Sequence, residues 1–262
     1  MDILVLDGIG SHGRTSGVID ETAHRLAETT GGEAHWLPWE ASMMGIGGES
    51  LWPDSSDEGV RLIRQFMDSH SGDVVLLAYS GGNRPVHEFL RTHSEYLHRV
   101  RAVGLMSDPW RPNSRWQSGT PYPGTGWGIM GQDHGPIPDR TYWTTVPGDL
   151  ISDADPDSLL RHVADTTDGH LDDIAAEFIR KAEAGRLQLI PFLGLPPWQW
   201  FFGLRDRIRR ALDEAYGYVI GGLHTRGYVD PYPTTDGDDR SLAIRLADTI
   251  SWKVRNPREE DK

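Results

Sequence analysis

The chain has 262 residues, of which 37% are hydrophobic and none is cysteine, and its formal net charge is −13 at pH 7. This length and hydrophobic content allow a substantial core, so the chain fits one α/β domain, with or without a helical insertion. The negative charge argues against a general nucleic-acid binder, because it repels phosphates. The absence of cysteine excludes disulfide bonds, thiolate metal sites and thiol nucleophiles.

The amino-terminal segment MDILVLDGIGSHG has an acidic residue at Asp2 and only a short apolar run after it. A secretory signal starts with positive charge and has a longer apolar region. No run in the chain approaches the length of a membrane span. We therefore expect a protein that is made soluble in the cytoplasm without a signal peptide, has no stable membrane insertion, and reaches any site outside the cell by another route.

The first 150 residues alternate between strand-like and helix-like patterns. Helices are expected near residues 16–29, 58–69 and 84–97. The expected strands are ILVL (3–6), AHWLPW (34–39), DVVLLAY (73–79), RAVGLMS (101–107) and TYWTTV (141–146). Strands that alternate with helices predict a mainly parallel sheet that is covered on both faces.

The pattern changes at residues 157–220, where helix follows helix without a convincing strand. Two apolar stripes mark this stretch, one with Leu171, Ile174, Ala175, Phe178 and Ile179, the other with Leu204, Ile208, Leu212 and Ala215. We interpret residues 157–220 as an inserted helical subdomain. Residues 1–156 and 221–262, the latter with a closing helix near 240–252, would then form the α/β domain.

A short segment, AYSGG at residues 78–82, follows the third expected strand and precedes a helix. Small residues around a serine are typical of a nucleophile elbow, a tight strand-to-helix turn that holds the hydroxyl above the sheet. The elbow strains the serine backbone, and larger neighbours would collide with the strand and the helix. An ordinary strand that ends in a turn would show the same residues, so Ser80 needs partners elsewhere.

A serine hydroxyl becomes an effective nucleophile when a histidine accepts its proton and an acid orients that histidine. In the hydrolases that have such elbows, the acid and then the histidine follow the serine, each in a loop after a strand. Asp149, after the Pro-Gly break in TYWTTVPGDLIS, fits the acid, and His224, one of 11 histidines, fits the base in GGLHTRGYVDPYP. Asp108 and Asp153 are competing acids.

The segments AYSGG, VPGDLIS and GGLHTRGYVD together resemble the cutinase-like α/β hydrolases, and in particular the phage lysin B esterases. The resemblance continues in VLDGIGSHG, which is similar to the oxyanion loop, and in GLMSDPWR, GWGIMG and residues 157–220. This chain differs from the family at Ala78, where the elbow signature has glycine, and at Gly81, where the family often has glutamine.

This resemblance implies an α/β-hydrolase fold with an inserted helical linker subdomain, no cofactor, and a triad of Ser80, Asp149 and His224. It also implies a substrate, the ester between mycolic acids and arabinogalactan in the cell envelope of mycobacteria and their relatives. A phage would use such an esterase as an endolysin in cell wall lysis. The enzyme would act at the host envelope after its release from the host cytoplasm.

The loop GIGSHG at residues 8–13 supports two interpretations. In an esterase, the backbone N–H groups of Ile9 and Gly81 would stabilise the oxyanion of the tetrahedral intermediate. The same G-x-G-x-x-G spacing, after a strand and before a helix, is also typical of dinucleotide binding and of an NAD-binding oxidoreductase. That alternative lacks a ribose-binding acid at the end of the second strand, because Glu40 comes late, after Leu-Pro-Trp.

Aromatic residues gather in two segments, DPWRPNSRWQSGTPYPGTGWG and PFLGLPPWQWFFGL. The first is an expected long loop at the sheet edge, and long loops in compact domains are often functional. The second is either the core of the helical insertion or an apolar groove for an acyl chain. The candidate substrate-facing residues are Trp110, Trp127, Trp198, Trp200 and Phe201.

The residues therefore predict a serine carboxylic ester hydrolase, and the resemblance implies a mycolyl-arabinogalactan lipid ester as its substrate. We expect no metal, because DGDD at residues 236–239 lacks the alternating ligands and closing glutamate of an EF-hand. The alternatives are a cutinase-like lipolytic enzyme for other lipid esters, an NAD-binding oxidoreductase, and a non-catalytic lipid- or wall-binding module. No protein partner is predicted.

Overall fold

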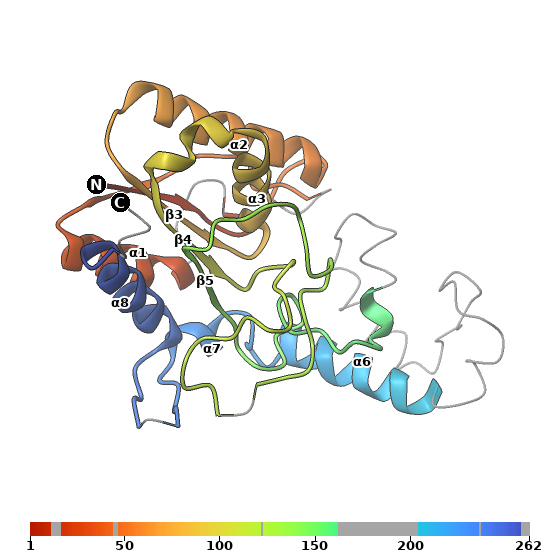
Figure 1. The fold of residues 1–262 in the computed structure, drawn as a ribbon. Coiled ribbons are helices and arrows are strands. Elements are labelled where there is room, and N and C mark those ends of the chain that lie inside the picture. The colour runs from red at the N-terminus through yellow and green to blue at the C-terminus, as the bar shows by residue number, and fades with distance from the viewer. Residues whose placement is uncertain (12–16, 44–46, 122, 162–203, 236, 258–262) are drawn as a thin grey trace.

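In the part of the chain that the structure describes, five parallel strands form one sheet in the order β2-β1-β3-β4-β5. A computed structural model describes residues 1–11, 17–43, 47–121, 123–161, 204–235 and 237–257. The strands are β1 (Asp2–Leu6), β2 (Glu33–Trp36), β3 (Val74–Tyr79), β4 (Val100–Met106) and β5 (Thr141–Thr144) (Figure 1). Each neighbouring pair is parallel, so the predicted parallel α/β sheet is confirmed.

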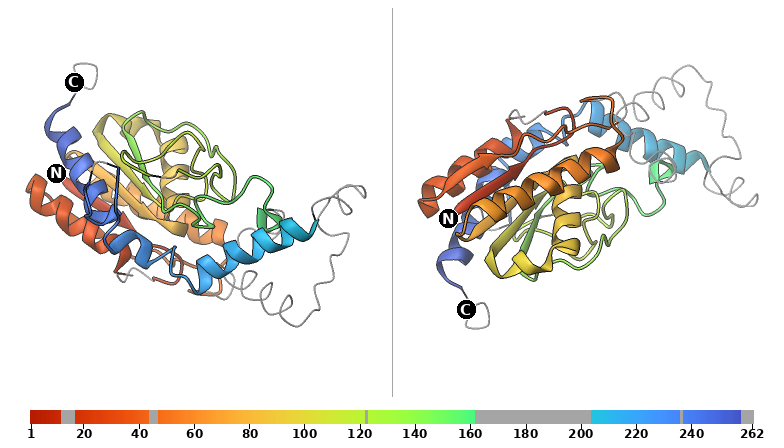
Figure 2. Two further views of the ribbon diagram at one scale, coloured as in Figure 1. Left: turned by 90° about the horizontal axis from the view of Figure 1, so that it is seen from below. Right: turned by 90° about the horizontal axis from the view of Figure 1, so that it is seen from above.

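Helices cover both faces of this sheet (Figure 2). On one face lie α1 (Val18–Thr30) and α8 (Leu242–Arg255), and on the other lie α2 (Trp52–Ser69) and α3 (Asn83–Thr92). Side chains alternate across a strand, and in β1 Ile3 and Val5 join the first core whereas Leu4 and Leu6 join the second. Because both faces of β1 and β3 are buried, these two strands read as nearly continuous apolar runs.

Two predicted helices have other bounds in the structure. The helix expected at 58–69 begins at Trp52, because Pro53 fits the first helical turn, where its missing N–H costs nothing. The helix expected at 84–97 ends at Thr92 and is followed by a separate 3₁₀ helix, Ser94–Arg99. The predicted strand at 34–39 ends at Trp36, before Pro38, which has no N–H to donate.

The described part of the expected insertion includes the helix α6 (Leu204–Val219), which lies outside the sheet (Figure 1). Ala211 and Ala215 of α6 pack with Leu150 and Ile151, which follow Asp149 in the chain. Residues 162–203, most of the predicted insertion, lie outside the described residues, so the domain division stays a prediction. In the described ranges, no helix combines the length and apolarity that a membrane span needs.

The strand order places a topological switch point between β1 and β3. The chain passes from β1 through α1 to β2 on one side, and from β3 through α3 to β4 on the other. In open α/β sheets, ligands bind outside the carboxyl ends of the strands at this point. The loop after β1 and the turn after β3 therefore mark the expected site.

Candidate active site

Ser80 lies in a strained turn at the carboxyl end of β3. Its φ of 52° is in the left-handed region, which non-glycine residues rarely adopt. A short 3₁₀ helix, Ser80–Gly82, leads directly into α3. A Cβ at Gly82 would lie 2.6 Å from the carbonyl oxygen of Asp7, so glycine is required there. The turn has the features of the predicted nucleophile elbow.

Ser80, Asp149 and His224 lie together although they are far apart in the sequence. The Nε2 atom of His224 is 2.9 Å from the Oγ of Ser80, and its Nδ1 atom is 3.1 Å from Oδ1 of Asp149. Asp149 is completely buried, and 8% of the surface of His224 is exposed. The three predicted triad residues therefore form a continuous hydrogen-bonded chain.

The two competing acids have other partners. The carboxylate of Asp108 lies 3.0 Å from Nε2 of His87 and accepts a hydrogen bond from Nε1 of Trp143 at 2.8 Å. Asp153 forms an ion pair with Arg111 at 3.2 Å. Among the described contacts, neither acid is bonded to His224, so the geometry favours Asp149.

Three hydroxyl groups donate hydrogen bonds to Oδ2 of Asp149. They belong to Ser107 at 2.5 Å, Tyr228 at 2.5 Å and Ser152 at 3.1 Å. Burial by itself raises the pKa of Asp149, but the charge of His224 and the hydrogen bonds from His224, Ser107 and Tyr228 outweigh it. The net pKa lies below the ordinary value, so Asp149 is an anion at neutral pH.

Two tyrosines fix the position of His224. The ring of Tyr79 stacks against the imidazole with the ring centroids 5.1 Å apart, and its hydroxyl donates to the backbone oxygen of His224. The ring of Tyr218, on α6, lies 4.9 Å from the imidazole. Sequence reasoning missed both tyrosines, although Tyr79 stands beside Ser80 in the elbow.

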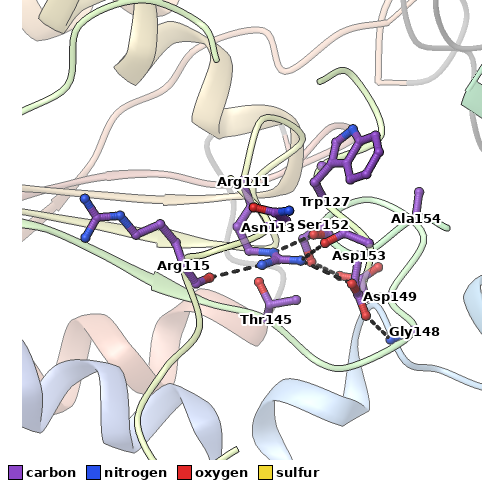
Figure 3. A network of polar contacts seen from close by, with 12 residues as sticks. Arg111, Asn113, Arg115, Trp127, Thr145, Gly148, Asp149, Ser152, Asp153 and Ala154 are labelled. Atoms are coloured by element: carbon purple, nitrogen blue, oxygen red, sulfur yellow. Dashed lines mark hydrogen bonds and ion pairs between the residues drawn. The ribbon is translucent and has the colours of Figure 1, made fainter. Parts of the chain in front are cut away.

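A buried arginine connects the turn that contains Asp149 to the long loop after β4. Figure 3 shows the guanidinium of Arg111 pointing toward Ser152 and Asp153, beside Asp149. Its Nε donates to the Ser152 oxygen at 2.6 Å and its Nη2 to the Gly126 oxygen at 2.9 Å. Burial raises the pKa of Asp153 despite this ion pair and lowers that of Arg111. Arg111 therefore fixes the position of Ser152, one of the residues whose hydroxyl donates a hydrogen bond to Asp149.

The loop after β1 lies directly against the elbow. A Cβ at Gly81 would stand 2.7 Å from Cδ1 of Ile9 and 3.5 Å from its backbone nitrogen. Gly10 anchors this loop by donating its N–H to the Ala41 oxygen at 2.8 Å. No described residue accepts a hydrogen bond from the N–H of Ile9. The structure thus brings Ile9 and Gly81 together, and the Ile9 side chain fills the space that a larger residue 81 would need.

A small apolar cluster of Met43, Trp52 and Trp110 lies beside Ile9. Trp52 and Trp110 stack with their centroids 5.5 Å apart, and Nε1 of Trp52 donates to the Gly81 oxygen at 3.2 Å. Only 5% of Trp110 is exposed, so it supports the elbow from inside the protein.

The other aromatic candidates lie elsewhere. Trp127 is half-buried, with the guanidinium of Arg161 4.3 Å from the centre of its ring. Trp198, Trp200 and Phe201 lie outside the described residues. Over the described ranges, no group of three His, Asp or Glu side chains is arranged to hold a metal ion.

Searches by sequence and by structure give different results. No family model matches the chain, and no curated protein matches it. The crystal structure of lysin B from mycobacteriophage D29 superimposes with a TM-score of 0.53 at 17% identity, over 86% of this chain and 94% of that one. The chain has the α/β-hydrolase fold of that lysin B. At this low identity the comparison shows the fold alone.

Two further solved structures match a smaller part of the chain. A cutinase-like protein from Cryptococcus sp. has a TM-score of 0.47 at 16% identity, over 58% of this chain and 78% of that one. An acetyl xylan esterase has the same TM-score and identity, over 59% of this chain and 86% of that one. We draw no functional argument from these two matches.

Proposed function

We propose that the chain is a serine carboxylic ester hydrolase with Ser80 as nucleophile, His224 as general base and Asp149 as the acid that orients His224. One observation supports this most strongly. A serine in a strained elbow at the switch point of the sheet lies 2.9 Å from a histidine nitrogen, while the other nitrogen of that histidine faces a buried aspartate. This geometry supports the proposal, because a Ser-His-Asp triad is recognised by such an arrangement.

In the proposed reaction, Ser80 Oγ attacks the ester carbonyl and His224 Nε2 takes its proton. The backbone N–H groups of Ile9 and Gly81 would stabilise the negative oxygen of the tetrahedral intermediate. The intermediate collapses when the carbon–oxygen bond to the alcohol breaks, and His224 gives its proton to the departing alkoxide. Water, activated by His224, then attacks the acyl-enzyme, releases the acid and restores Ser80. Asp149 keeps the imidazole in one tautomer throughout.

For the substrate, we infer a mycolyl ester of arabinogalactan, cleaved during phage-mediated host lysis. The support is the match with a lysin B fold over 86% of the chain, together with the sequence resemblance in the elbow, the acid turn and the histidine loop. A cutinase-like preference for other lipid esters is the second candidate.

The dinucleotide alternative fits the structure less well. Asp7 is buried, and its carboxylate accepts a hydrogen bond from the N–H of Gly8 at 2.7 Å. A pyrophosphate at this loop would meet a carboxylate and would lose that N–H donor. The helix α1 begins only at Val18, five positions after the last glycine of the motif, whereas a dinucleotide site uses the helix N-terminus directly.

Hydrolysis of p-nitrophenyl butyrate tests the esterase proposal. We expect the wild-type chain to turn over the ester, and Ser80→Ala to fold normally and lose roughly a thousandfold or more in kcat/KM. Near-normal activity of Ser80→Ala would contradict the triad. Absence of activity in the wild type, with intact folding by circular dichroism, would favour the non-catalytic lipid- or wall-binding module.

A second assay tests the substrate. The wild type should release free mycolic acids from mycobacterial arabinogalactan–peptidoglycan, and Ser80→Ala should not. Turnover of small esters without mycolate release would leave the esterase proposal intact and remove the mycolyl substrate in favour of other lipid esters.

The predicted acyl-chain contacts of Trp198 and Trp200 are tested by a double alanine variant. If both contact a long acyl chain, the variant should lose much more activity on palmitate than on butyrate esters, because these contacts form only with a long chain. Core residues would instead lower the melting temperature and both activities together.

A further inference from the structure

Ser107 occupies a position that matches that of Ser80 on the neighbouring strand. In the β3–β4 register Tyr79 pairs with Met106, the last residue of β3 with the last residue of β4. Ser80 and Ser107 each come directly after the end of their strand. Ser107 has a φ of 50° and Ser80 a φ of 52°. Glycine is the usual residue in this conformation. We therefore expect the hydroxyl group of Ser107 to have a function at this position.

One side chain ties the two serine turns together. Nδ2 of Asn83 lies 2.8 Å from the Ser80 oxygen, 3.0 Å from the Met106 oxygen and 3.4 Å from the Ser107 oxygen. Asn83 is completely buried. The backbone at Ser107 is therefore fixed relative to the nucleophile.

The Ser107 hydroxyl contacts both partners of the proposed acid–base pair. Its Oγ lies 2.5 Å from Oδ2 of Asp149 and 3.0 Å from Nδ1 of His224. A hydroxyl has one proton to donate and lone pairs to accept, and an ionised carboxylate only accepts. The Ser107 proton therefore points to Asp149, and the Ser107 lone pair faces the Nδ1 atom of His224.

This arrangement fixes the tautomer of the histidine. Both neighbours of Nδ1, the Asp149 carboxylate and the Ser107 oxygen, are acceptors, so Nδ1 must be the protonated nitrogen. Nε2 is then free to accept the proton of Ser80, which lies 2.9 Å away. The hydrogen bond at one ring nitrogen determines the state of the other.

The other hydroxyls around Asp149 are arranged differently. Ser152 lies 3.1 Å from Asp149 Oδ2 and 3.3 Å from the hydroxyl of Tyr228. In the described contacts, neither Ser152 nor Tyr228 is hydrogen-bonded to the imidazole of His224. Ser107 is thus the hydroxyl that joins the acid to the histidine.

We propose that Ser107 is a positioning residue that holds the His224 imidazole in the tautomer that Ser80 requires, a role that rests on the proposed esterase function. Ser107 is fully buried and acts through His224 and Asp149 without touching the substrate. Removal of its hydroxyl should therefore lower kcat and leave KM nearly unchanged.

The kinetic test uses p-nitrophenyl butyrate and four variants. Ser107→Ala and Ser107→Gly should each lose roughly ten- to a hundredfold in kcat, the range for a lost hydrogen bond to a charged group. The glycine variant separates the hydroxyl from the backbone, because both variants lack the hydroxyl and glycine alone relieves the strain at φ 50°. Its melting temperature should therefore be higher than that of Ser107→Ala. Ser152→Ala, which removes a hydroxyl that contacts Asp149 but is not bonded to the His224 imidazole, should lose less than Ser107→Ala. Ser80→Ala measures the contribution of the triad itself.

A second readout is the tautomer of His224, measured by ¹⁵N NMR of histidine-labelled protein. The wild type should show a slowly exchanging Nδ1–H, and Ser107→Ala should show faster exchange and a fraction protonated at Nε2. Full kcat in Ser107→Ala with an unchanged tautomer, or equal losses in Ser107→Ala and Ser152→Ala, would overturn the proposal. If Ser80→Ala also keeps its activity, the proposed esterase mechanism fails as well, so the two failures are distinguishable.

Discussion

Among the residues that the structure describes, two Asp–His pairs are buried, and one of them faces the proposed nucleophile Ser80. In the first, His224 contacts Asp149 through Nδ1 and Ser80 through Nε2. In the second, Nε2 of His87, the nitrogen that would have to face a nucleophile, lies 3.0 Å from the Asp108 carboxylate.

The surroundings of the two pairs explain this difference. The Asp108 carboxylate also accepts hydrogen bonds from Nε1 of Trp143 and from the backbone N–H of Trp110. The ring of His87 packs edge-on against the ring of Trp110. These partners connect α3 to β5 and to the long loop after β4. An Asp–His pair thus stabilises the fold in one place and, in our proposal, performs acid–base chemistry in the other.

The largest expected contrast comes from replacing each aspartate by asparagine. Asp149→Asn should lower kcat by roughly a thousand- to ten-thousandfold, because the amide favours the wrong histidine tautomer. Asp153→Asn, which removes the partner of Arg111, should be mild by comparison. The kcat values on a chromogenic ester, measured well below the melting temperature, check this order. A larger loss of kcat in Asp153→Asn than in Asp149→Asn would mean that Asp153 is the acid that orients His224.

Asp108→Asn should act on stability instead of chemistry. The asparagine amide has one acceptor oxygen where the carboxylate has two, so the hydrogen bond to Trp143 or the one to His87 is lost. Such a loss in a buried site lowers the free energy of unfolding by about 1–3 kcal/mol. That corresponds to a fall of roughly 3–10 °C in melting temperature for a chain of this size. Differential scanning calorimetry beside kcat at 20 °C separates the effects. A thousandfold loss of kcat with an unchanged melting temperature would mean that the second pair also takes part in catalysis.

A smaller effect should come from the contact between Gly81 and Ile9. Gly81→Ala would push a Cβ against the Ile9 side chain and displace the proposed oxyanion N–H groups, for a loss of roughly tenfold in kcat. Ile9→Ala removes the obstructing atoms, so the double variant should recover activity relative to Gly81→Ala. Kinetics on the two single variants and the double variant form a double-mutant cycle. Additive losses would show that the side-chain collision is not the cause.

The smallest expected effect is a difference in pH dependence between Asp108 and Asp153. Burial raises the pKa of Asp108, but the charge and hydrogen bond of His87 outweigh burial and hold it below the ordinary value. Its stabilisation is therefore present above about pH 4 and is lost as the pH falls through the lower, folded-state value. Burial leaves the pKa of Asp153 above the ordinary value, so its ionised form disfavours folding at neutral pH.

These opposite signs predict opposite trends in melting temperature between pH 7 and pH 3. The wild type should lose its advantage over Asp108→Asn as the pH falls below about 4, and should gain relative to Asp153→Asn as the pH falls from 7 toward 4. Parallel trends for the two variants would contradict the assigned directions.

Local sequence patterns predicted the parallel sheet and a tight turn after its third expected strand, where the structure has a short 3₁₀ helix. The strands β1 and β3 are nearly continuous apolar runs. The small residues of AYSGG are explained by a turn in which Gly82 lies against the end of β1. The start of α2 was missed because WPDSSD at residues 52–57 resembles a turn, although proline and aspartate are equally suited to the first turn of a helix.

The partners of Asp149 could not be predicted from local patterns. Ser107 lies 42 residues before Asp149 and Tyr228 lies 79 residues after it, and no spacing rule joins positions that meet only through the tertiary fold. Both acids follow the same strand, and the choice of Asp149 over Asp153 rested on its place directly after the Pro-Gly break and on a family resemblance. The distances to His224 and Arg111 separate the two acids.

The most direct test of the central claim is to identify the residue that a fluorophosphonate ester modifies. Our account predicts one adduct on the wild type, mapped by peptide mass spectrometry to Ser80, with no adduct on Ser80→Ala and much slower labelling of His224→Ala. A single adduct on another serine, or equal labelling of the wild type and Ser80→Ala, would contradict it.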